Sequence, residues 1–421
     1  MNTTLTFVLV FLLVDASYAE VPRQDDETDN LPENPQKLIQ SFVVFVDGIR
    51  SPKENIYADE NEYNKKWSIE RNQLTEGGKA LMERVGRSLQ TRYKSNIIYN
   101  TGFIKATSNG RPTAKASVDS VLHGIYEVPD GFKWRIKDIK IEELYIESWT
   151  RFRGNSDLFE TNQEDTTCKQ YTLLRDKIIQ GEMKKLSTEQ KSAIKEVIDQ
   201  STKSEVAVKP IETLDDVFDL WDNFQMMKLN KKELPKWVVP LMPKIEKLVH
   251  HRLFTRVYPH LQYYTGQLLY EILNYMAKQY NDWKDSYDAN ENGGNLFGSV
   301  PQNDVIHLHG SDDVTVTAMV WALTKDTEYM ASPGDTLIFE VSVPKMNIEL
   351  FLYSPLNPEH RSKFKELKLK KFCNELPCNV DDVISKLRSN GLYLNQEEWE
   401  KMCQGNFLDK TKSKLCGVLG F

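Results

Sequence analysis

At residues 43–52 the chain reads Val43-Val44-Phe45-Val46-Asp47-Gly48-Ile49-Arg50-Ser51-Pro52. The β-branched and aromatic side chains of residues 41–46, followed by Gly48 and Pro52, predict a buried strand that leads into a loop. Asp47 and Arg50 then lie at the carboxyl end of this strand, which is where ligands bind in open α/β sheets. We therefore expect both residues to belong to a functional site.

The same stretch resembles the R-H-G-x-R-x-P signature of the histidine acid phosphatases, with Val46 in place of the first arginine and Asp47 in place of the nucleophilic histidine. The resemblance continues through Leu74-Thr75, Gly78, Gly86 and Arg92-Tyr93, through His307-Leu308-His309-Gly310-Ser311-Asp312-Asp313, and through Gly334-Asp335-Thr336-Leu337-Ile338-Phe339-Glu340. It implies an α/β fold with a histidine-phosphatase-like parallel-sheet core flanked by helices and an inserted helical cap domain.

The resemblance also implies roles for the residues of the site. In that family the histidine attacks phosphorus, arginines hold the phosphoryl oxygens, and a later histidine–aspartate pair completes the site. Here the later pair reads Asp312-Asp313, and Arg50 and Asp313 correspond to the second arginine and the general acid. Counting back from residues 124–126 places the family's third arginine at Thr107.

Helical and strand patterns divide the chain into segments. Apolar side chains recur at helical spacing after Thr75, residues 97–99 and 117–126 predict a strand and a helix, and this alternation is typical of a parallel sheet. Thr213 with Asp216 resembles a capping box that begins a run of helices, in which Trp221 belongs to an apolar face that favours packing. We expect an α/β core at 37–150 and 255–405 and a mainly helical cap at 151–254.

Later segments return to strands. Residues 304–308 predict a strand with Asp312 and Asp313 just beyond its end, and residues 337–343 and 348–353 predict a hairpin. Residues 406–421 form the predicted C-terminal tail.

The first residues predict export. An apolar run at 7–14 followed by Ser17-Tyr18-Ala19 is typical of a secretory signal peptide, residues 1–19, which precedes a flexible leader at 20–36 that is rich in Asp, Glu, Pro and Asn. We expect a secreted, extracellular protein. A formal net charge of -7, with Lys and Glu interspersed, argues against nucleic acid or an anionic membrane as partner, and the oligomeric state stays open.

The chain of 421 residues contains five cysteines: Cys168, Cys373, Cys378, Cys403 and Cys416. Secretion favours disulfides, and the odd count leaves at least one thiol outside intramolecular pairs. The family resemblance implies the bridges Cys168-Cys403 and Cys373-Cys378. No C-x2-C pair points to a metal site, and we expect neither a metal nor a cofactor.

The substitutions change the chemistry of the site. Phosphoryl transfer here would need an imidazole nucleophile and several fixed cations. With Val46 and Thr107 at arginine positions and Asp47 and Asp312 at histidine positions, the site has about two fewer positive and about two more negative charges. The sequence therefore predicts a pocket that favours cations in a protein that is not an enzyme.

A ligand with a primary ammonium group would balance the negative charge of this pocket by donating hydrogen bonds to Asp47 and to Asp312 or Asp313. Its aromatic body would stack on side chains at the pocket mouth. The candidates by loop position are Tyr57, Trp67, Tyr145, Trp149 and Phe152.

Other readings of the same residues stay open. One hypothesis is that Asp47 acts as an aspartyl nucleophile in an altered hydrolase. A second is that Asp47, Asp312 and Asp313 together bind a metal ion. A third is that Asp47 simply pairs with Arg50. The neighbouring histidines His307 and His309 point to one face of their strand, where a structural role is the commoner outcome.

A secreted acid phosphatase-like chain without the nucleophile resembles the acid phosphatase-like salivary proteins of blood-feeding insects, fleas in particular. That resemblance implies a non-enzymatic scavenger of biogenic amines (serotonin-like) and of cysteinyl leukotrienes, which opposes host haemostasis and inflammation. A leukotriene would need an apolar channel and cations such as Arg50, Arg151 or Arg153. The alternatives are an acid phosphatase-like hydrolase with residual or altered activity that uses Asp47 or Asp313, and a protein that binds collagen or a host protease through its surface.

Overall fold

The computed structural model describes ten stretches of the chain. These are residues 37–93, 104–126, 139–143, 168–204, 208–291, 306–343, 345–358, 363–369, 371–373 and 376–404. The predicted signal peptide (1–19), leader (20–36), strand at 97–99 and C-terminal tail (406–421) lie outside them. Residues Gln36–Phe421 form one compact unit, to which the following description applies.

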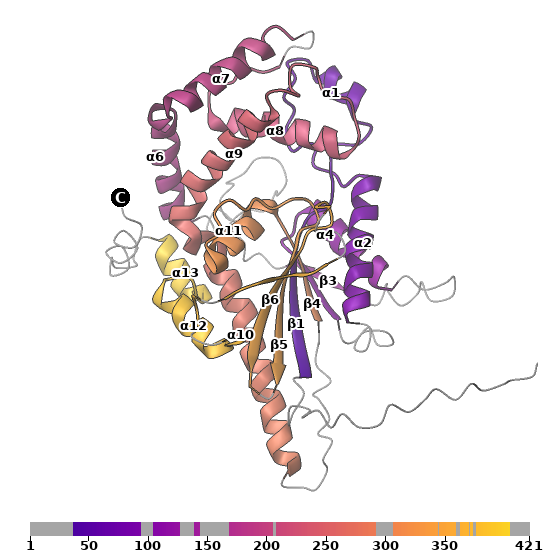
Figure 1. Cartoon of the computed structure of the whole chain (residues 1–421), viewed down its shortest axis with the longest axis vertical. Helices are drawn as coiled ribbons and strands as arrows, with labels where there is room; N and C mark the ends of the chain where they lie inside the picture. The colour runs from indigo at the N-terminus through magenta and orange to yellow at the C-terminus, as the bar shows by residue number, and fades with distance from the viewer. Residues whose placement is uncertain are drawn as a thin grey trace, which may run out of the picture. The chain divides into compact units, whose positions relative to one another are not determined.

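A mixed sheet forms the centre of this unit (Figure 1). The strands are β1 (Lys37–Val46), β2 (Ile104–Ser108), β3 (Ile141–Glu143), β4 (Ile306–Ser311), β5 (Thr336–Val343), β6 (Asn347–Tyr353), β7 (Lys365–Leu367) and β8 (Cys378–Asn379). Their order is β3-β2-β4-β1-β5-β6-β7, with β8 paired to β6. β3, β2, β4 and β1 run parallel, as predicted, whereas β5, β6 and β7 are antiparallel. The hairpin predicted at 337–343 and 348–353 is confirmed as β5 and β6, which are antiparallel because a short connection joins only antiparallel strands.

Helices cover both faces of the sheet. Val43 and Phe45 of β1 point to the face covered by α2 (Glu76–Arg92) and α4 (Pro112–Ile125). Phe42, Val44 and Val46 point to the other face, where α10 (Leu261–Glu291), α11 (Asp313–Thr324) and α12 (Val380–Ser389) pack. The alternation along β1 is that of a strand buried on both faces.

α2 and α4 cross at very short distance. A Cβ added to Gly86 would lie 2.1 Å from the carbonyl oxygen of Val121, and one added to Gly124 would lie 2.0 Å from that of Glu83. Only glycine allows this approach. The crossing fixes α4, whose N-terminus borders the site described below.

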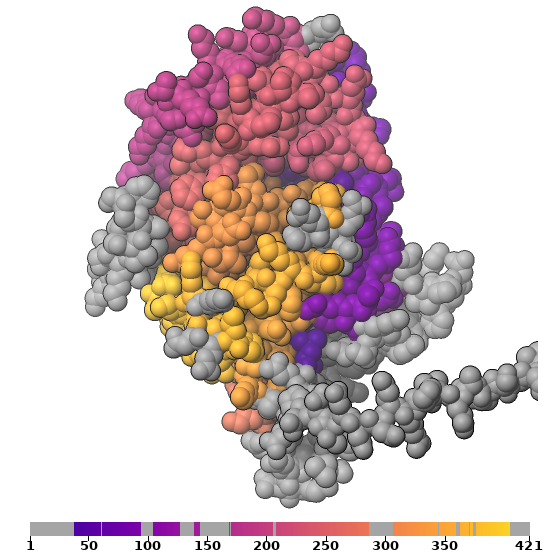
Figure 2. All heavy atoms as spheres, in the orientation of Figure 1, coloured from indigo at the N-terminus to yellow at the C-terminus, as the bar shows by residue number. Residues whose placement is uncertain are grey.

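A second group of helices lies between β3 and β4 in the sequence. It comprises α6 (Lys169–Lys185), α7 (Thr188–Ser201), α8 (Leu214–Leu229) and α9 (Met242–Val257), which are magenta to pink in Figures 1 and 2. Figure 2 shows them above the C-terminal segments, which are yellow. The capping box predicted at Thr213 and Asp216 is confirmed. The exact core and cap boundaries at 150 and 254 stay predictions.

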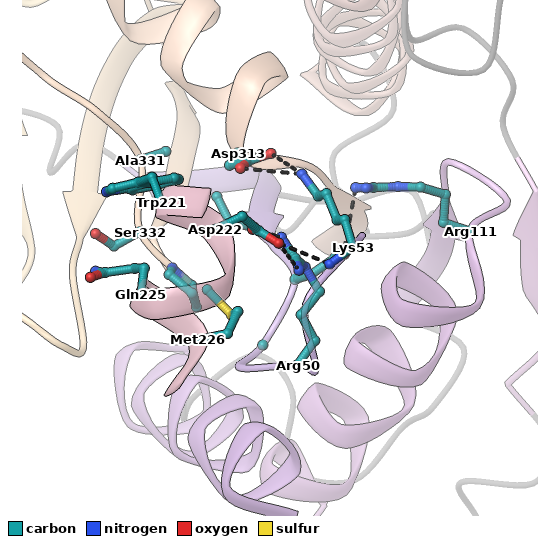
Figure 3. A pocket seen from close by; sticks show the side chains of 14 residues that line it. Arg50, Lys53, Arg111, Trp221, Asp222, Gln225, Met226, Asp313, Ala331 and Ser332 are labelled. Carbon is teal, nitrogen blue, oxygen red and sulfur yellow. Dashed lines mark hydrogen bonds and ion pairs between the residues drawn. The ribbon is translucent and has the colours of Figure 1, made fainter. Parts of the chain in front are cut away.

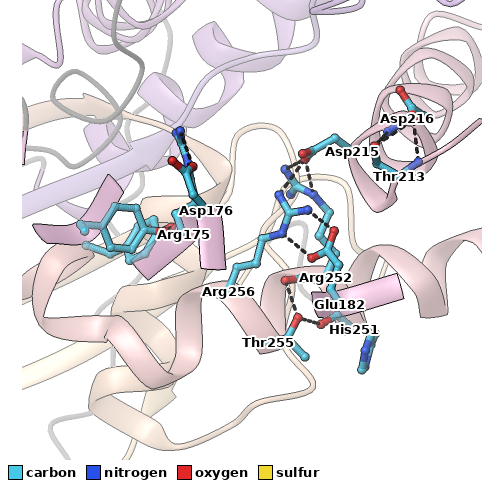
Figure 4. A network of polar contacts seen from close by, with 12 residues as sticks. Arg175, Asp176, Glu182, Thr213, Asp215, Asp216, His251, Arg252, Thr255 and Arg256 are labelled. Carbon is cyan, nitrogen blue, oxygen red and sulfur yellow. Dashed lines mark hydrogen bonds and ion pairs between the residues drawn. The ribbon is translucent and has the colours of Figure 1, made fainter. Parts of the chain in front are cut away.

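Ion pairs, of which Arg256–Glu182 is buried, tie three of these helices together (Figure 4). Arg256 of α9 donates to Glu182 of α6 at 2.9 Å and to Asp215 of α8 at 2.8 Å. Arg252 also donates to Asp215 at 2.8 Å. Burial opposes ionisation of Asp215, but the two arginines outweigh it and lower its pKa. These ion pairs anchor the first turn of α8, two turns before Asp222.

The remaining helices are α1 (Glu60–Lys66), the 3-10 turn η4 (Tyr258–His260) and α13 (Gln396–Cys403). The disulfides are Cys168–Cys403, which joins α6 to α13 across 235 residues, and Cys373–Cys378. Both pairings implied by the resemblance are confirmed, and Cys416 lies outside the described residues. Within the described ranges no helix is both long and apolar enough to cross a membrane.

Candidate functional site

Three parallel strands end side by side at one edge of the sheet. Val46 of β1 pairs with Ser311 of β4, and Ser108 of β2 pairs with Gly310. The residues that follow these strands therefore meet at the same edge, as expected for a ligand site in an α/β sheet. They include Asp47, Arg111, Asp312 and Asp313.

A cavity of about 40 Å³ opens at this edge (Figure 3). The sheet edge and the loop after β1 contribute Asp47, Arg50, Lys53, Arg111 and Asp313, and α8 contributes Trp221, Asp222, Gln225 and Met226. The loop Ala331–Pro333 before β5 completes the lining. A water molecule needs roughly 10–15 Å³ by this kind of measure, so the cavity has room for a few waters or one small polar group.

Asp47 is buried against a counter-charge. Its Oδ2 accepts a hydrogen bond from Thr113 at 2.8 Å and lies 3.2 Å from Nη2 of Arg111. Its Oδ1 is buried and has no hydrogen-bond partner among the described residues. Burial raises the pKa of Asp47, although Arg111 and Thr113 act in the opposite direction.

Arg111 corrects the charge count made from the sequence. The structure brings Arg111, not Thr107, to the cavity, where it pairs with Asp47 and lies 3.7 Å from Asp312. It is the N-cap of α4, which begins at Pro112, so the strand-to-helix loop places it at the sheet edge. The charge count made from the sequence therefore omitted a cation, Arg111, that lies in the cavity.

Arg50 is held by a carboxylate from the cap. Its Nη1 and Nη2 donate to the two oxygens of Asp222 at 3.0 and 2.6 Å, and the backbone N–H of Lys53 donates to Asp222 at 2.8 Å. Burial would lower the pKa of Arg50, but Asp222 outweighs it and raises the value. Asp222 thus occupies the partner position that the sequence analysis considered for Asp47.

The two acids after β4 differ in role. Asp313 lines the cavity and lies 3.2 Å from Nζ of Lys53. Burial opposes its ionisation, yet Lys53, Arg50 and Arg111 together hold its pKa well below the usual range. Asp312 lies beyond the cavity lining, where it caps α11 by accepting from the N–H of Thr315 at 2.8 Å. The sequence grouped both acids as ligand contacts, and the structure brings only Asp313 to the cavity.

The aromatic side chains chosen by loop position do not line the cavity. Tyr57 and Trp67 are buried in the apolar cluster formed with the helical cap, where the hydroxyl of Tyr57 donates to Asn223 at 3.4 Å. Tyr145, Trp149 and Phe152 lie outside the described residues. Trp221, which the sequence assigned to packing, does contact that cluster but also lines the cavity.

Two side-chain polar atoms of the α8 residues in the lining are buried without a hydrogen-bond partner in the described part of the chain. They are Nε1 of Trp221, a donor, and Oε1 of Gln225, an acceptor. Buried polar groups normally have a hydrogen-bond partner, so we expect these two atoms to bond to water or to a ligand. Both belong to the same face of α8, one turn apart.

His307 and His309 are structural. Thr107 contacts Nε2 of His307 at 2.9 Å and Nδ1 of His309 at 2.8 Å, and Phe42 packs on the His307 ring. Burial lowers the pKa of His307 well below its usual value. Neither histidine lines the cavity. Within the described ranges, no group of three or more His, Cys, Asp or Glu side chains is arranged to hold a metal ion.

The fold is shared with known phosphatases. No protein-family model and no curated protein sequence matches the chain. Among solved structures, Hafnia alvei phytase in complex with myo-inositol hexakis sulphate superposes with a TM-score of 0.56 at 12% identity, covering 85% of this chain and 99% of that one. The phytase of Klebsiella sp. ASR1 gives 0.50 at 14% identity, covering 85% and 98%.

The chain has the fold of the histidine acid phosphatases. This agrees with the fold class predicted from residues 43–52. At 12% identity the likeness concerns the fold alone, so the activity has to be argued from the cavity itself.

Proposed function

We propose that this protein binds small primary amines at the cavity and does not hydrolyse phosphate esters. The observation that carries the proposal is Oδ1 of Asp47, a buried carboxylate oxygen of a lining residue that has no hydrogen-bond partner among the described residues. An ammonium group would donate to it in a charge-assisted hydrogen bond worth about 1.5–3 kcal/mol.

The charges around the cavity also support a cationic ligand. Three cations of the lining, Arg50, Lys53 and Arg111, face three carboxylates of the lining, Asp47, Asp222 and Asp313. Asp312, just beyond the lining and 3.7 Å from Arg111, adds a fourth, which leaves one negative charge when all seven groups are ionised. This excess is smaller than the sequence analysis predicted, because Arg111 and Lys53 had not been counted. Binding of a cation would also lower the cost of ionising buried Asp47.

The size of the cavity limits how a ligand would enter. A volume of about 40 Å³ admits an ammonium group but not an aromatic body. In the proposed mode only the ammonium enters, while the body of the ligand rests against Trp221 and Met226 of α8. Nε1 of Trp221 and Oε1 of Gln225 would then bond to waters or to polar groups of the ligand.

Three features argue against phosphatase chemistry. The nucleophile position holds a carboxylate, which repels a phosphate dianion. The guanidinium of Arg50 is already engaged by Asp222. Asp313, at the general-acid position, lies 3.2 Å from Nζ of Lys53, and Lys53, Arg50 and Arg111 lower its pKa despite burial, which disfavours the protonated form that a general acid needs.

Isothermal titration calorimetry tests the proposal. The mature chain would be titrated with serotonin, histamine, noradrenaline and leukotriene C4. Saturable binding of at least one amine near one site per chain is expected, and flat traces for all three amines would overturn the proposal.

A second candidate is an acid phosphatase-like hydrolase that uses Asp47 or Asp313. The presence of Arg50, Lys53 and Arg111 in one cavity favours it, since fixed cations stabilise phosphoryl oxygens. Turnover of p-nitrophenyl phosphate that is abolished by Asp47→Ala would select this candidate. The first proposal expects no turnover by either protein.

The proposal also includes leukotriene binding and an extracellular, salivary location. Both rest on the resemblance to the acid phosphatase-like salivary proteins. The two disulfides fit an oxidising, extracellular compartment. Of the cations named for leukotriene carboxylates, Arg50 is engaged by Asp222, and Arg151 and Arg153 lie outside the described residues. A heat signal for leukotriene C4 without one for amines would shift the ligand class from cation to anion.

A further inference from the structure

Asp222 reaches the cavity from the helical cap. It is 1% exposed and contacts Arg50 through both carboxylate oxygens, at 2.6 and 3.0 Å (Figure 3). The backbone N–H of Lys53 adds a third hydrogen bond at 2.8 Å. The other acids of the lining, Asp47 and Asp313, follow strands of the sheet instead.

A bound oxyanion would contact the guanidinium of Arg50 with the same geometry as the carboxylate of Asp222. A guanidinium holds a carboxylate, phosphate or sulfate through the same pair of parallel N–H donors. An oxyanion that entered the cavity would therefore compete with Asp222 for the same two nitrogen atoms and for the N–H of Lys53. Asp222 has the advantage of being part of the chain, so it pays no entropy of association.

The position of Asp222 is fixed independently of Arg50. Neighbouring residues of α8, such as Leu220 and Phe224, are buried in the apolar cluster of the cap, and Arg252 and Arg256 anchor Asp215 at the start of the helix. Asn230, just after α8, donates to the carbonyl oxygen of Arg50 at 3.2 Å. Asp222 is thus held against the guanidinium by the packing of a whole helix.

We propose that Asp222 is a built-in anion that keeps phosphate-like and sulfate-like oxyanions out of the cavity, and so determines the charge class of its ligands. The cavity retains three cations, and what closes it to anions is a carboxylate supplied by the cap. The inference shares the ligand cavity with the proposed function and rests on it to that extent. It does not depend on which amine binds.

The test is orthophosphate binding by the Asp222→Asn variant at neutral pH. Binding is measured by calorimetry and by the increase in the thermal unfolding temperature when orthophosphate is added. The variant is expected to bind orthophosphate at least tenfold more tightly than the unaltered protein. The double variant Arg50→Met/Asp222→Asn should lose this binding, because it lacks the guanidinium. Asp215→Asn is the matched control: it also removes an ion-paired acid from α8, but away from the cavity, and it should not respond to orthophosphate.

The outcomes separate this inference from the proposed function. A folded Asp222→Asn that ignores orthophosphate, or an unaltered protein that binds it equally well, overturns the role of Asp222, whatever serotonin does. If Asp222→Asn is unfolded in plain buffer, the inference requires orthophosphate to restore its cooperative unfolding transition, and failure to do so overturns it. Absence of binding of serotonin, histamine and noradrenaline by the unaltered protein would instead contradict the proposed function alone.

Discussion

The guanidinium of Arg111 lies 3.2 Å from the carboxylate of Asp47, and both side chains are almost completely buried. This pair lies at the carboxyl end of β1, where the sequence resemblance places the nucleophile of the histidine acid phosphatases. Because Asp47 keeps its second oxygen unpartnered within the described residues, the pair neutralises the carboxylate without saturating it. The cavity therefore remains able to accept a hydrogen-bond donor.

Removing Arg111 should strongly destabilise the protein. Arg111→Met leaves Asp47 and Asp312 buried without their shared counter-charge, and the free energy of unfolding should fall by about 3–5 kcal/mol in a urea titration. Lys115→Met is the control, since Lys115 is on the same helix but its pair with Glu143 is exposed, and it should change stability by less than about 0.5 kcal/mol. Equal changes in the free energy of unfolding for the two substitutions would show that the buried pair of Arg111 and Asp47 stabilises the protein no more than the exposed pair of Lys115 and Glu143.

Amine affinity should fall on acidification. Burial raises the pKa of Asp47 above its ordinary value, so the carboxylate takes up a proton at a pH where an ordinary aspartate is still ionised. Protonation removes the acceptor charge, and serotonin binding should weaken as pH is lowered toward that raised pKa. Affinity that stays constant from pH 8 to about pH 4, the ordinary range of aspartate titration, would contradict the role of Asp47.

Asp219 should make stability fall as pH rises. Burial and the nearby acids Glu54 and Asp222 raise its pKa to about 7, whereas in the unfolded chain it titrates near about 3.9. The fold therefore holds the proton more tightly, and the stability gained from this is lost as pH rises from about 4 to about 7.

Asp219→Asn removes that dependence. Relative to the unaltered protein it should gain about 1–2 kcal/mol between pH 4 and pH 8, a figure already reduced for the partial exposure of the group. Exposed Asp199→Asn should give the same difference at both pH values, within about 0.5 kcal/mol. Denaturant titrations at the two pH values measure this, and an identical response of both variants would refute the prediction.

The crossing of α2 and α4 should tolerate no side chain at Gly86. A Cβ there would lie 2.1 Å from a backbone oxygen of α4, so Gly86→Ala should lower the free energy of unfolding by about 1–3 kcal/mol or more. Gly77 is in the first turn of the same helix with its nearest contact at 3.8 Å, so Gly77→Ala should instead stabilise the protein by about 0.5–1 kcal/mol. A destabilising Gly77→Ala with a neutral Gly86→Ala would reject this account of the packing.

The sequence predicted the strand before Asp47, the helix after Thr75, the acids after β4 and both disulfides, because each depends on a local pattern or on the family resemblance. It did not identify Arg111 as a site residue. Thr107 lies in β2, whereas Arg111 is the N-cap of α4, and counting back from residues 124–126 passed over the loop between them. Pro112 at the first position of α4 is the local signal that would have located the loop and Arg111.

Other features of the site depend on contacts between distant segments. Asp222 is 172 residues from Arg50, and nothing in the sequence distinguishes it from Asp215 or Asp219 on the same helix. Tyr57 follows a loop that suggested the pocket mouth, but this loop pairs with Val208 and buries the ring against the cap. Tertiary packing determines which of these side chains reaches the cavity, and the periodicity of the sequence does not predict that packing.

The most direct test of the account is the affinity of the Asp47→Asn variant for serotonin, measured by calorimetry beside the unaltered protein and the surface variant Asp199→Asn. The amide keeps the shape of the side chain and removes its charge. The account predicts that Asp47→Asn binds at least tenfold more weakly, a loss of about 1.4 kcal/mol, while Asp199→Asn binds normally. Equal affinity in all three proteins would contradict it, because the amine would then be held somewhere other than the carboxylate of Asp47.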